Sequence, residues 1–378
     1  MARMGQNARR SLSRLSVRLT RKSQAETATA VRSENSSNGP RVRMGVASVP
    51  GRKRRMAARA SEGLIVGNED RVDVDRELGL TAVIDGHGGS LCADFLARHA
   101  LERLREALSS RGLLEAIRRQ SRSPIFTEGQ LEEDSSADDD DDCEHDVDQL
   151  FSHENDEGDE EQNVRHASDA GLDESLQGVH DSLKETFAAL EEEFREIWER
   201  TGETSGACAL LSVVFGNMCV VAHCGDCRAV YRPASQRSHR LLRRSPTLTI
   251  QATDDHRTSS PAEYDRITDA GGVISNGRID NLSPTRTFGD WDIKMRVGEG
   301  IVVAEPQVVV IPITSPVLIV LGTDGIWDSM PNKRVLDTAI RELNLNEGNY
   351  NKAAKALAKT ATQGTNDDAS CVLLHIEP

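Results

Sequence analysis

Short apolar runs that lie next to aspartates recur at distant points of this chain of 378 residues, and they constrain its fold most strongly. Asp85 ends the run Ala82-Val83-Ile84, Asp324 follows the run 318–321, and Asp367 comes just before the run 371–374. Short apolar runs bounded by turn residues are typical of buried strands. Because carboxylates at strand ends can converge at one edge of a sheet, the pattern predicts a sheet protein with an acidic site at that edge.

The spacing of apolar residues predicts the elements between these aspartates. We expect strands over 41–49, two strands within 71–84 joined by a turn at 75–79, and further strands over 208–215, 218–224, 229–231, 302–311, 317–322 and 371–376. We expect helices over 90–118, 174–199, 260–270 and 352–362. The order is neither strict β-α-β alternation nor all-β, so the chain is expected to have an α+β fold with two packed sheets and helices outside.

Charge and composition divide the chain into parts. Residues 1–22 hold seven Arg or Lys and no acid, and 23–40 are polar, so 1–40 is expected to be a disordered basic tail. A transit peptide, a lipid-surface helix or a docking tail would share this composition. Residues 131–162 hold 17 Asp or Glu and no Lys or Arg, which predicts a disordered acidic insertion over 119–172 of the folded domain 41–378.

The same counts exclude several classes of protein. The net charge of −15 resides in the acidic segment, and the rest of the chain offers no broad basic face for nucleic acid. The sequence has no run of 18 apolar residues, so no transmembrane segment is expected, and nothing indicates an oligomer. Seven cysteines without a secretory signal predict reduced thiols in a cytoplasmic or nuclear protein, with organelle targeting by the basic tail left open.

The aspartates and a further acidic pair, Glu69-Asp70, form a candidate site for metal ions. Glycine follows both Asp85 and Asp324, which lets backbone carbonyls approach an ion. A single Asp-Gly after a strand is usually an ordinary turn, so the prediction depends on the ordered set. Oxygen ligands of this kind suit Mg²⁺ or Mn²⁺.

Several motifs resemble those of the metal-dependent protein phosphatases (type 2C, or PPM). Residues 84–89 (Ile-Asp-Gly-His-Gly-Gly) resemble the family's DGHGG signature, and 224–230 (Cys-Gly-Asp-Cys-Arg-Ala-Val) its GDSRAV element. Residues 288–290 resemble FGD, 321–328 resemble SDGLWD, and 366–370 resemble the DNxT/S element. The matches run in family order from about residue 45 to 376, so the set is far more specific than any one of them.

The resemblance implies an α-β-β-α sandwich that hydrolyses phosphoserine and phosphothreonine in phosphoproteins. It implies two divalent cations, Mg²⁺ or Mn²⁺, that activate a bridging water. Asp85 would bridge both ions, the Gly86 carbonyl would bind one ion, and Asp324 and Asp367 the other. Asp226 would lie near a weaker third site, and His87 would protonate the leaving oxygen.

The sequence departs from the family at the phosphate-binding arginine. We match Glu69-Asp70 to the family's Glu-Asp element, which places Ile65 where that arginine is expected. Arg52, Lys53 or Arg54 could supply the missing cation from before a small insertion.

Other residues are interpreted as structural. Asp368, which replaces the family's Asn, is expected to face water, and His256 to be a loop residue. Cys224 and Cys227 are expected to flank a turn, because no second pair completes a zinc site and no thioredoxin-like context supports a redox dithiol.

Two functions therefore remain open. The first is an active serine/threonine phosphatase. The second is a pseudophosphatase that keeps the fold and docks partner proteins without turnover, as the displaced arginine would allow.

Overall fold

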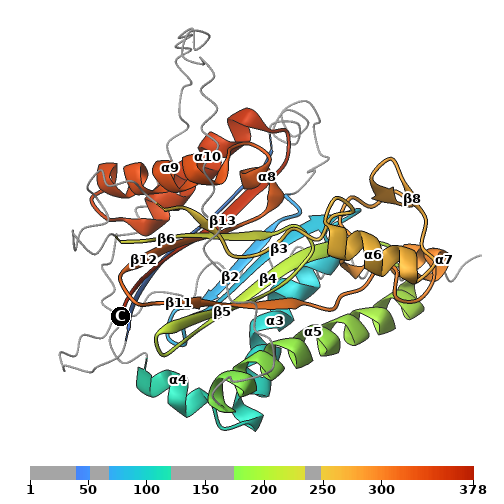
Figure 1. Ribbon diagram of the computed structural model, residues 1–378, viewed down its shortest axis with the longest axis horizontal. Coiled ribbons are helices and arrows are strands. Elements are labelled where there is room, and N and C mark those ends of the chain that lie inside the picture. The colour runs from blue at the N-terminus through green and yellow to red at the C-terminus, as the bar shows by residue number, and fades with distance from the viewer. Residues whose placement is uncertain (1–39, 52–67, 121–173, 235–247) are drawn as a thin grey trace, which may run out of the picture. The chain divides into compact units, whose positions relative to one another are not determined.

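The computed structural model describes residues 40–51, 68–120, 174–234 and 248–378 (Figure 1). All of them belong to one compact unit, Ser37–Pro378. The basic tail expected over 1–40 (apart from Pro40), most of the acidic insertion, and Arg52, Lys53 and Arg54 lie outside the described residues.

Two antiparallel sheets form the centre of this unit. The first contains, in spatial order, β1 (Arg41–Val49), β13 (Ala369–Glu377), β12 (Val317–Gly322), β6 (Arg228–Pro233) and β7 (Ile250–Gln251). The second contains β11 (Gln307–Pro312), β5 (Met218–Cys224), β4 (Gly206–Phe215), β3 (Leu80–His87) and β2 (Arg71–Asp75), and β10 (Phe288–Gly289) also pairs with β4. β8 (Ile274–Ser275) and β9 (Arg278–Ile279) form a separate small ladder.

The helices form outer layers on the two sheets (Figure 1). Buried residues of α3 (Leu91–Ser110), α4 (Leu114–Gln120) and α5 (Glu174–Thr201) pack on the second sheet. Those of α8 (Asp324–Trp327), α9 (Asn332–Leu345) and α10 (Tyr350–Gly364) pack on the first. The facing sides of the two sheets share a third apolar cluster. The expected α+β class and its α-β-β-α layering are therefore confirmed.

A smaller apolar cluster lies beside this sandwich. It joins α6 (Pro261–Asp269) and α7 (Trp291–Val297) through Ile267, Ile293 and Ile301. The segment that carries these two helices lies between β7 and β11 in the chain.

Two expected elements differ in the structure, and one long helix was not expected. The helix expected over 90–118 is interrupted, because α3 ends at Ser110 and Gly112 adopts φ +68° before α4 begins. The strand expected from 302 begins only at Gln307, after Pro306, which has no N–H to donate to a ladder. Helix α9 was not predicted, although Val335, Leu336, Ala339 and Leu343 place a buried stripe on it. Within the described residues, no helix is both long and apolar enough to cross a membrane.

The topology brings three distant loops to one end of the sandwich. β3 belongs to the second sheet and β12 to the first, and both strands end there. The turn from β5 to β6 passes from the second sheet to the first at the same end. Side chains at residues 85, 226 and 324 are thereby brought together.

Candidate metal centre

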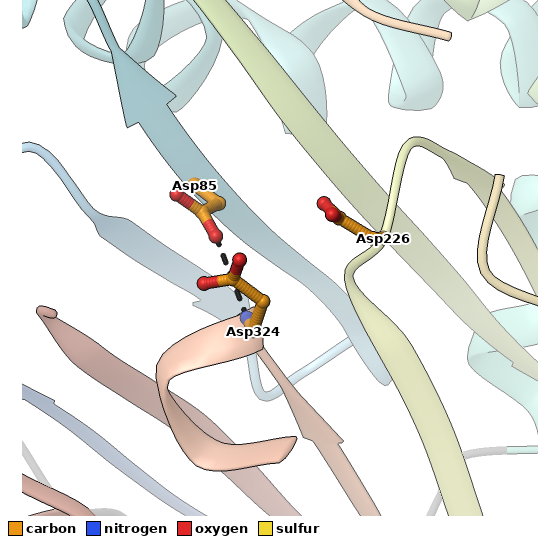
Figure 2. Close-up of side chains that lie close together, drawn as sticks. All are labelled: Asp85, Asp226 and Asp324. Carbon is orange, nitrogen blue, oxygen red and sulfur yellow. Dashed lines mark hydrogen bonds between the residues drawn. The ribbon is translucent and has the colours of Figure 1, made fainter. Parts of the chain in front are cut away.

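Three aspartates converge at this end of the sandwich (Figure 2). One carboxylate oxygen from each of Asp85, Asp226 and Asp324 lies within 4.8 Å of the other two. Asp85 lies near the end of β3, Asp226 in the β5–β6 turn, and Asp324 at the first position of α8. The backbone N–H of Asp324 points at Asp85 Oδ2, at 3.4 Å. The sequence placed Asp85 and Asp324 together correctly, and Asp226 lies closer to them than expected.

The turn that carries Asp226 depends on a close backbone approach. Gly225 has φ +99°, and a Cβ there would collide with the Cys208 thiol of the neighbouring strand β4. That thiol lies 3.2 Å from Asp226 Oδ1 and donates to it. Asp226 itself is buried, and this hydrogen bond holds its carboxylate against β4 of the second sheet.

Burial and mutual repulsion make the carboxyl groups of Asp85 and Asp324 poor anions without a cation. Burial raises the pKa of Asp85 well above its ordinary range, and the charges of Asp324, Asp70, Asp226 and Asp367 raise it further. Burial, with the charges of Asp226 and Asp367, raises the pKa of Asp324 to about 8. A hard divalent cation suits such clustered carboxylates, because its positive charge offsets their mutual repulsion and stabilises their ionised form. The residues present therefore fit the ions that the family resemblance implies.

Two other predicted acids support the cluster from the side. Asp70 is 4% exposed and accepts a hydrogen bond from Thr323 Oγ1 at 2.9 Å, next to Asp324. Burial raises its pKa to about 7. Glu69 contributes a backbone carbonyl that packs closely against Gly86, where a Cβ would collide with it. The Glu69-Asp70 pair thus lies beside the ends of β3 and β12, as the sequence suggested.

The neighbouring acids Asp367 and Asp368 have different surroundings. Asp367 is exposed, and its charge raises the pKa values of Asp85 and Asp324, but it is not one of the three aspartates with oxygens within 4.8 Å. The expectation that Asp368 faces water is wrong. It is 2% exposed and accepts backbone N–H bonds from Gly51 at 2.7 Å and Glu69 at 2.9 Å. Its carboxylate thus links the segment before β13 to the segments that contain Gly51 and Glu69.

A histidine and a buried aspartate lie next to the cluster. His87, the last residue of β3, is 2.8 Å from Asp290 Oδ2 through Nε2, and we call these two residues the acid–histidine pair. Asp290 is 2% exposed and has a left-handed backbone with φ 49°. Burial lowers the pKa of His87, but the hydrogen bond and charge of Asp290 outweigh this effect and raise the pKa overall. A Cβ at Gly206 would collide with both side chains of the pair.

Residues 288–290 were predicted as a motif without a role for Asp290, and Gly206 was not predicted as a site residue. The motif itself was the available signal for Asp290. The glycine at the start of a mostly apolar strand was the signal for Gly206.

A guanidinium that sequence analysis overlooked also contacts the cluster. Arg257 Nε donates to Asp226 Oδ2 at 3.0 Å. One terminal nitrogen of Arg257 lies 3.5 Å from both Asp324 Oδ2 and Asp328 Oδ1. The available signal was the position of Arg257 directly after His256, which the sequence indicated as a loop residue.

The cysteines near the site are consistent with a structural role. The six cysteines in the described part of the chain are all buried and form no disulfide with one another. Burial raises the pKa values of Cys224 and Cys227 well above their ordinary range, so both thiols stay protonated. A soft metal or redox site at this pair would need thiolates.

Fold and site together define an α-β-β-α sandwich with a cluster of aspartates at one end, and comparison with known proteins places the chain in a family. The model of the protein phosphatase 2C family matches residues 114–369, and the chain belongs to this family.

Two named relatives agree with this assignment. The chain is 35% identical over 161 residues to the rice protein named probable protein phosphatase 2C 2, which covers 42% of this chain and 39% of the relative. It is 29% identical over 204 residues to human probable protein phosphatase 1N, covering 52% and 44%. The chain thus spans less than half the length of these two relatives.

The solved structures show the same fold. A serine-threonine phosphatase 2C from Toxoplasma gondii superposes with a TM-score of 0.60 at 16% identity, covering 91% of this chain and 96% of the other. A sex determining protein of C. elegans superposes with a TM-score of 0.57 at 17% identity, covering 96% and 70%.

Proposed function

We propose that this chain is a protein serine/threonine phosphatase that uses two divalent cations, Mg²⁺ or Mn²⁺. The observation that carries the proposal is the convergence of Asp85, Asp226 and Asp324 within 4.8 Å, next to the acid–histidine pair. Membership of the protein phosphatase 2C family and the names of the relatives support the same activity.

In this proposal Asp85, the Gly86 carbonyl, Asp324 and Asp367 hold the ions, with Asp226 and the Glu69-Asp70 pair beside them. Bound divalent cations at this position would supply an activated water and offset the negative charge of the phosphate. The raised pKa values of Asp85 and Asp324 support this assignment, because they indicate carboxylates that gain most from a cation.

His87 is the proposed general acid. A serine or threonine alkoxide is a poor leaving group, so a proton must reach its oxygen as the P–O bond breaks. Asp290 would fix the ring through Nε2 and favour the protonated imidazolium, which leaves Nδ1–H as the donor. His87 is 31% exposed, so a substrate oxygen in solvent contact can approach it.

The partners of this activity are phosphoproteins. The buried thiols without disulfides fit the intracellular location, cytoplasmic or nuclear, that the sequence suggested. The expected phosphate-binding residues Arg52, Lys53 and Arg54 lie outside the described residues. Arg257 is engaged by three carboxylates. This engagement is the observation that keeps the pseudophosphatase in play as a second candidate.

One assay separates the two candidates. The full chain is incubated with a phosphothreonine peptide with and without Mn²⁺, beside Asp85→Asn, and the released phosphate is measured. Release that needs Mn²⁺ and is abolished by Asp85→Asn supports the phosphatase. An unmodified protein that binds Mn²⁺ but releases no phosphate is the result expected of a docking module.

A further inference from the structure

We propose that the guanidinium of Arg257 takes the place of a third metal ion, so that this chain binds two divalent cations where the family resemblance implies a weaker third. The inference rests on the proposed two-ion site. It concerns the side of the cluster formed by Asp226, Asp324 and Asp328, which we call the outer carboxylates.

The outer carboxylates converge on one side chain. Arg257 Nε donates to Asp226 at 3.0 Å, and a terminal nitrogen lies 3.5 Å from an oxygen of Asp324 and 3.5 Å from one of Asp328. A hard metal ion is usually bound by several carboxylates that converge on it in this way. Here the cation is part of the chain.

Asp226 has both oxygens engaged by the protein. Cys208 Sγ donates to Oδ1 at 3.2 Å, and Arg257 donates to Oδ2. A third ion held by Asp226 on this side would have to displace Arg257. Displacement would leave a guanidinium, which stays protonated at every accessible pH, without its anions.

The segment that carries Arg257 is tied to the turn that carries Asp226. Gly225 N–H donates to His256 Nδ1 at 3.1 Å, and His256 N–H donates to the Gly225 carbonyl at 3.1 Å. The His256 ring also stacks on His223 of β5, with centroids 4.4 Å apart and planes 4° from parallel. His256 is thus a loop residue, as expected, and it holds Arg257 and Asp226 in one rigid unit.

The charges near Asp324 are consistent with this role. Asp226 and Asp328 are acids on either side of Asp324, and nitrogens of Arg257 lie 3.0 Å from Asp226 and 3.5 Å from Asp324 and Asp328. Arg257 therefore offsets the repulsion that the outer carboxylates exert on a proposed metal ligand. A built-in cation does so without depending on the free metal concentration.

The test is the Mn²⁺ stoichiometry of the full chain. Free Mn²⁺ is followed by electron paramagnetic resonance during titration, well beyond saturation of the first ions. The variants are Arg257→Ala, Arg257→Lys and Arg257→Ala combined with Asp328→Asn. The control is Arg103→Ala, since Arg103 is 35% exposed, against 30% for Arg257, and also bridges two acids, Glu106 and Glu193. Both alanine variants change the net charge equally, so weak binding to the acidic segment is the same in each.

We expect two ions in the wild type, Arg257→Lys and Arg103→Ala, three in Arg257→Ala, and two again in the double variant. Three ions in the wild type, or two in Arg257→Ala, would overturn the inference while leaving the proposed function intact. A raised KM for phosphopeptide with the stoichiometry still at two would assign Arg257 to substrate binding instead. No Mn²⁺ binding by the wild type would instead refute the proposed function.

A folding defect is separated from loss of the cation by circular dichroism of each metal-free variant. If Arg257→Ala does not fold, Arg257→Gln serves in its place, because it removes the charge but keeps a hydrogen-bond donor for Asp226. It is expected to bind the third ion as well, and a stoichiometry of two would overturn the inference.

Discussion

Replacing Asp290 by asparagine tests whether the acid–histidine pair delivers a proton to the leaving group. Asparagine has nearly the same volume and tolerates the left-handed backbone found here, with φ 49°. The change therefore removes the charge next to His87 and leaves the turn in place. Asp290 is 2% exposed, so water would not replace the lost charge.

The magnitude follows from the hydrogen bond between His87 and Asp290. A hydrogen bond to a charged group contributes about 1.5–3 kcal/mol. At about 1.4 kcal/mol for each factor of ten, its loss predicts a roughly 10- to 100-fold lower kcat for a phosphothreonine peptide. The pKa of His87 should also fall, because Asp290 is what raises it, so the alkaline limb of the pH profile should move to lower pH.

The assay compares two substrates at saturating Mn²⁺. The p-nitrophenolate ion leaves without a proton, so turnover of p-nitrophenyl phosphate should change by no more than about threefold in Asp290→Asn. The control is Asp292→Asn, the same chemical change in α7 at a residue that pairs with Arg296. Equal losses on both substrates would refute the assignment, because they would indicate damage to the metal site or the fold rather than to proton delivery.

Three further predictions follow from the site. Gly206→Ala should lower phosphopeptide turnover about as much as Asp290→Asn does, because the added Cβ collides with the acid–histidine pair. Mn²⁺ affinity measured by titration should stay unchanged. Weaker Mn²⁺ binding would indicate damage to the metal site instead of to the acid–histidine pair. Asp368→Ala should lower the metal-free melting temperature by several degrees, since two backbone N–H groups lose a carboxylate acceptor worth about 1.5–3 kcal/mol each. Asp367→Ala should lower it less, since Asp367 is exposed and its bond from the Asp368 N–H is local, and it should weaken Mn²⁺ binding; similar melting by both variants would contradict the distinction. The metal-free protein should lose stability as pH rises from about 4 to 8, because the folded state keeps a proton on Asp324, whose pKa is about 8, and the unfolded state has released it. Mn²⁺ should therefore raise the melting temperature more at pH 8 than at pH 5.5. An equal rise at both pH values would refute the assignment of this carboxyl to the ion.

The sequence predicted the elements that its apolar periodicity describes directly. β1 and β12 have the expected bounds, and the turn between β2 and β3 lies where the sequence placed it. Asp85 and Asp324 were identifiable because each follows a run of buried apolar residues and precedes a glycine. The order of the motifs supplied the family, and with it the two-sheet arrangement that periodicity alone does not fix.

The missed features arise where loops distant in the sequence meet. Asp368 was expected in water because it follows another aspartate, yet it is buried by the segments that contain Gly51 and Glu69. Arg257 contacts acids 31 and more residues away, in the β5–β6 turn and at the two ends of α8. Local sequence reports propensity and periodicity, but such contacts depend on how the two sheets close on each other.

Anomalous diffraction from a crystal of the full chain soaked in Mn²⁺ tests the central claim most directly. The account predicts two peaks about 3.5–4 Å apart. Both should lie at coordinating distance from the carboxylate of Asp85, one of them also from Asp324, with Arg257 still bound to Asp226. A crystal in which no peak lies beside Asp85 and Asp324 at saturating Mn²⁺ would contradict it.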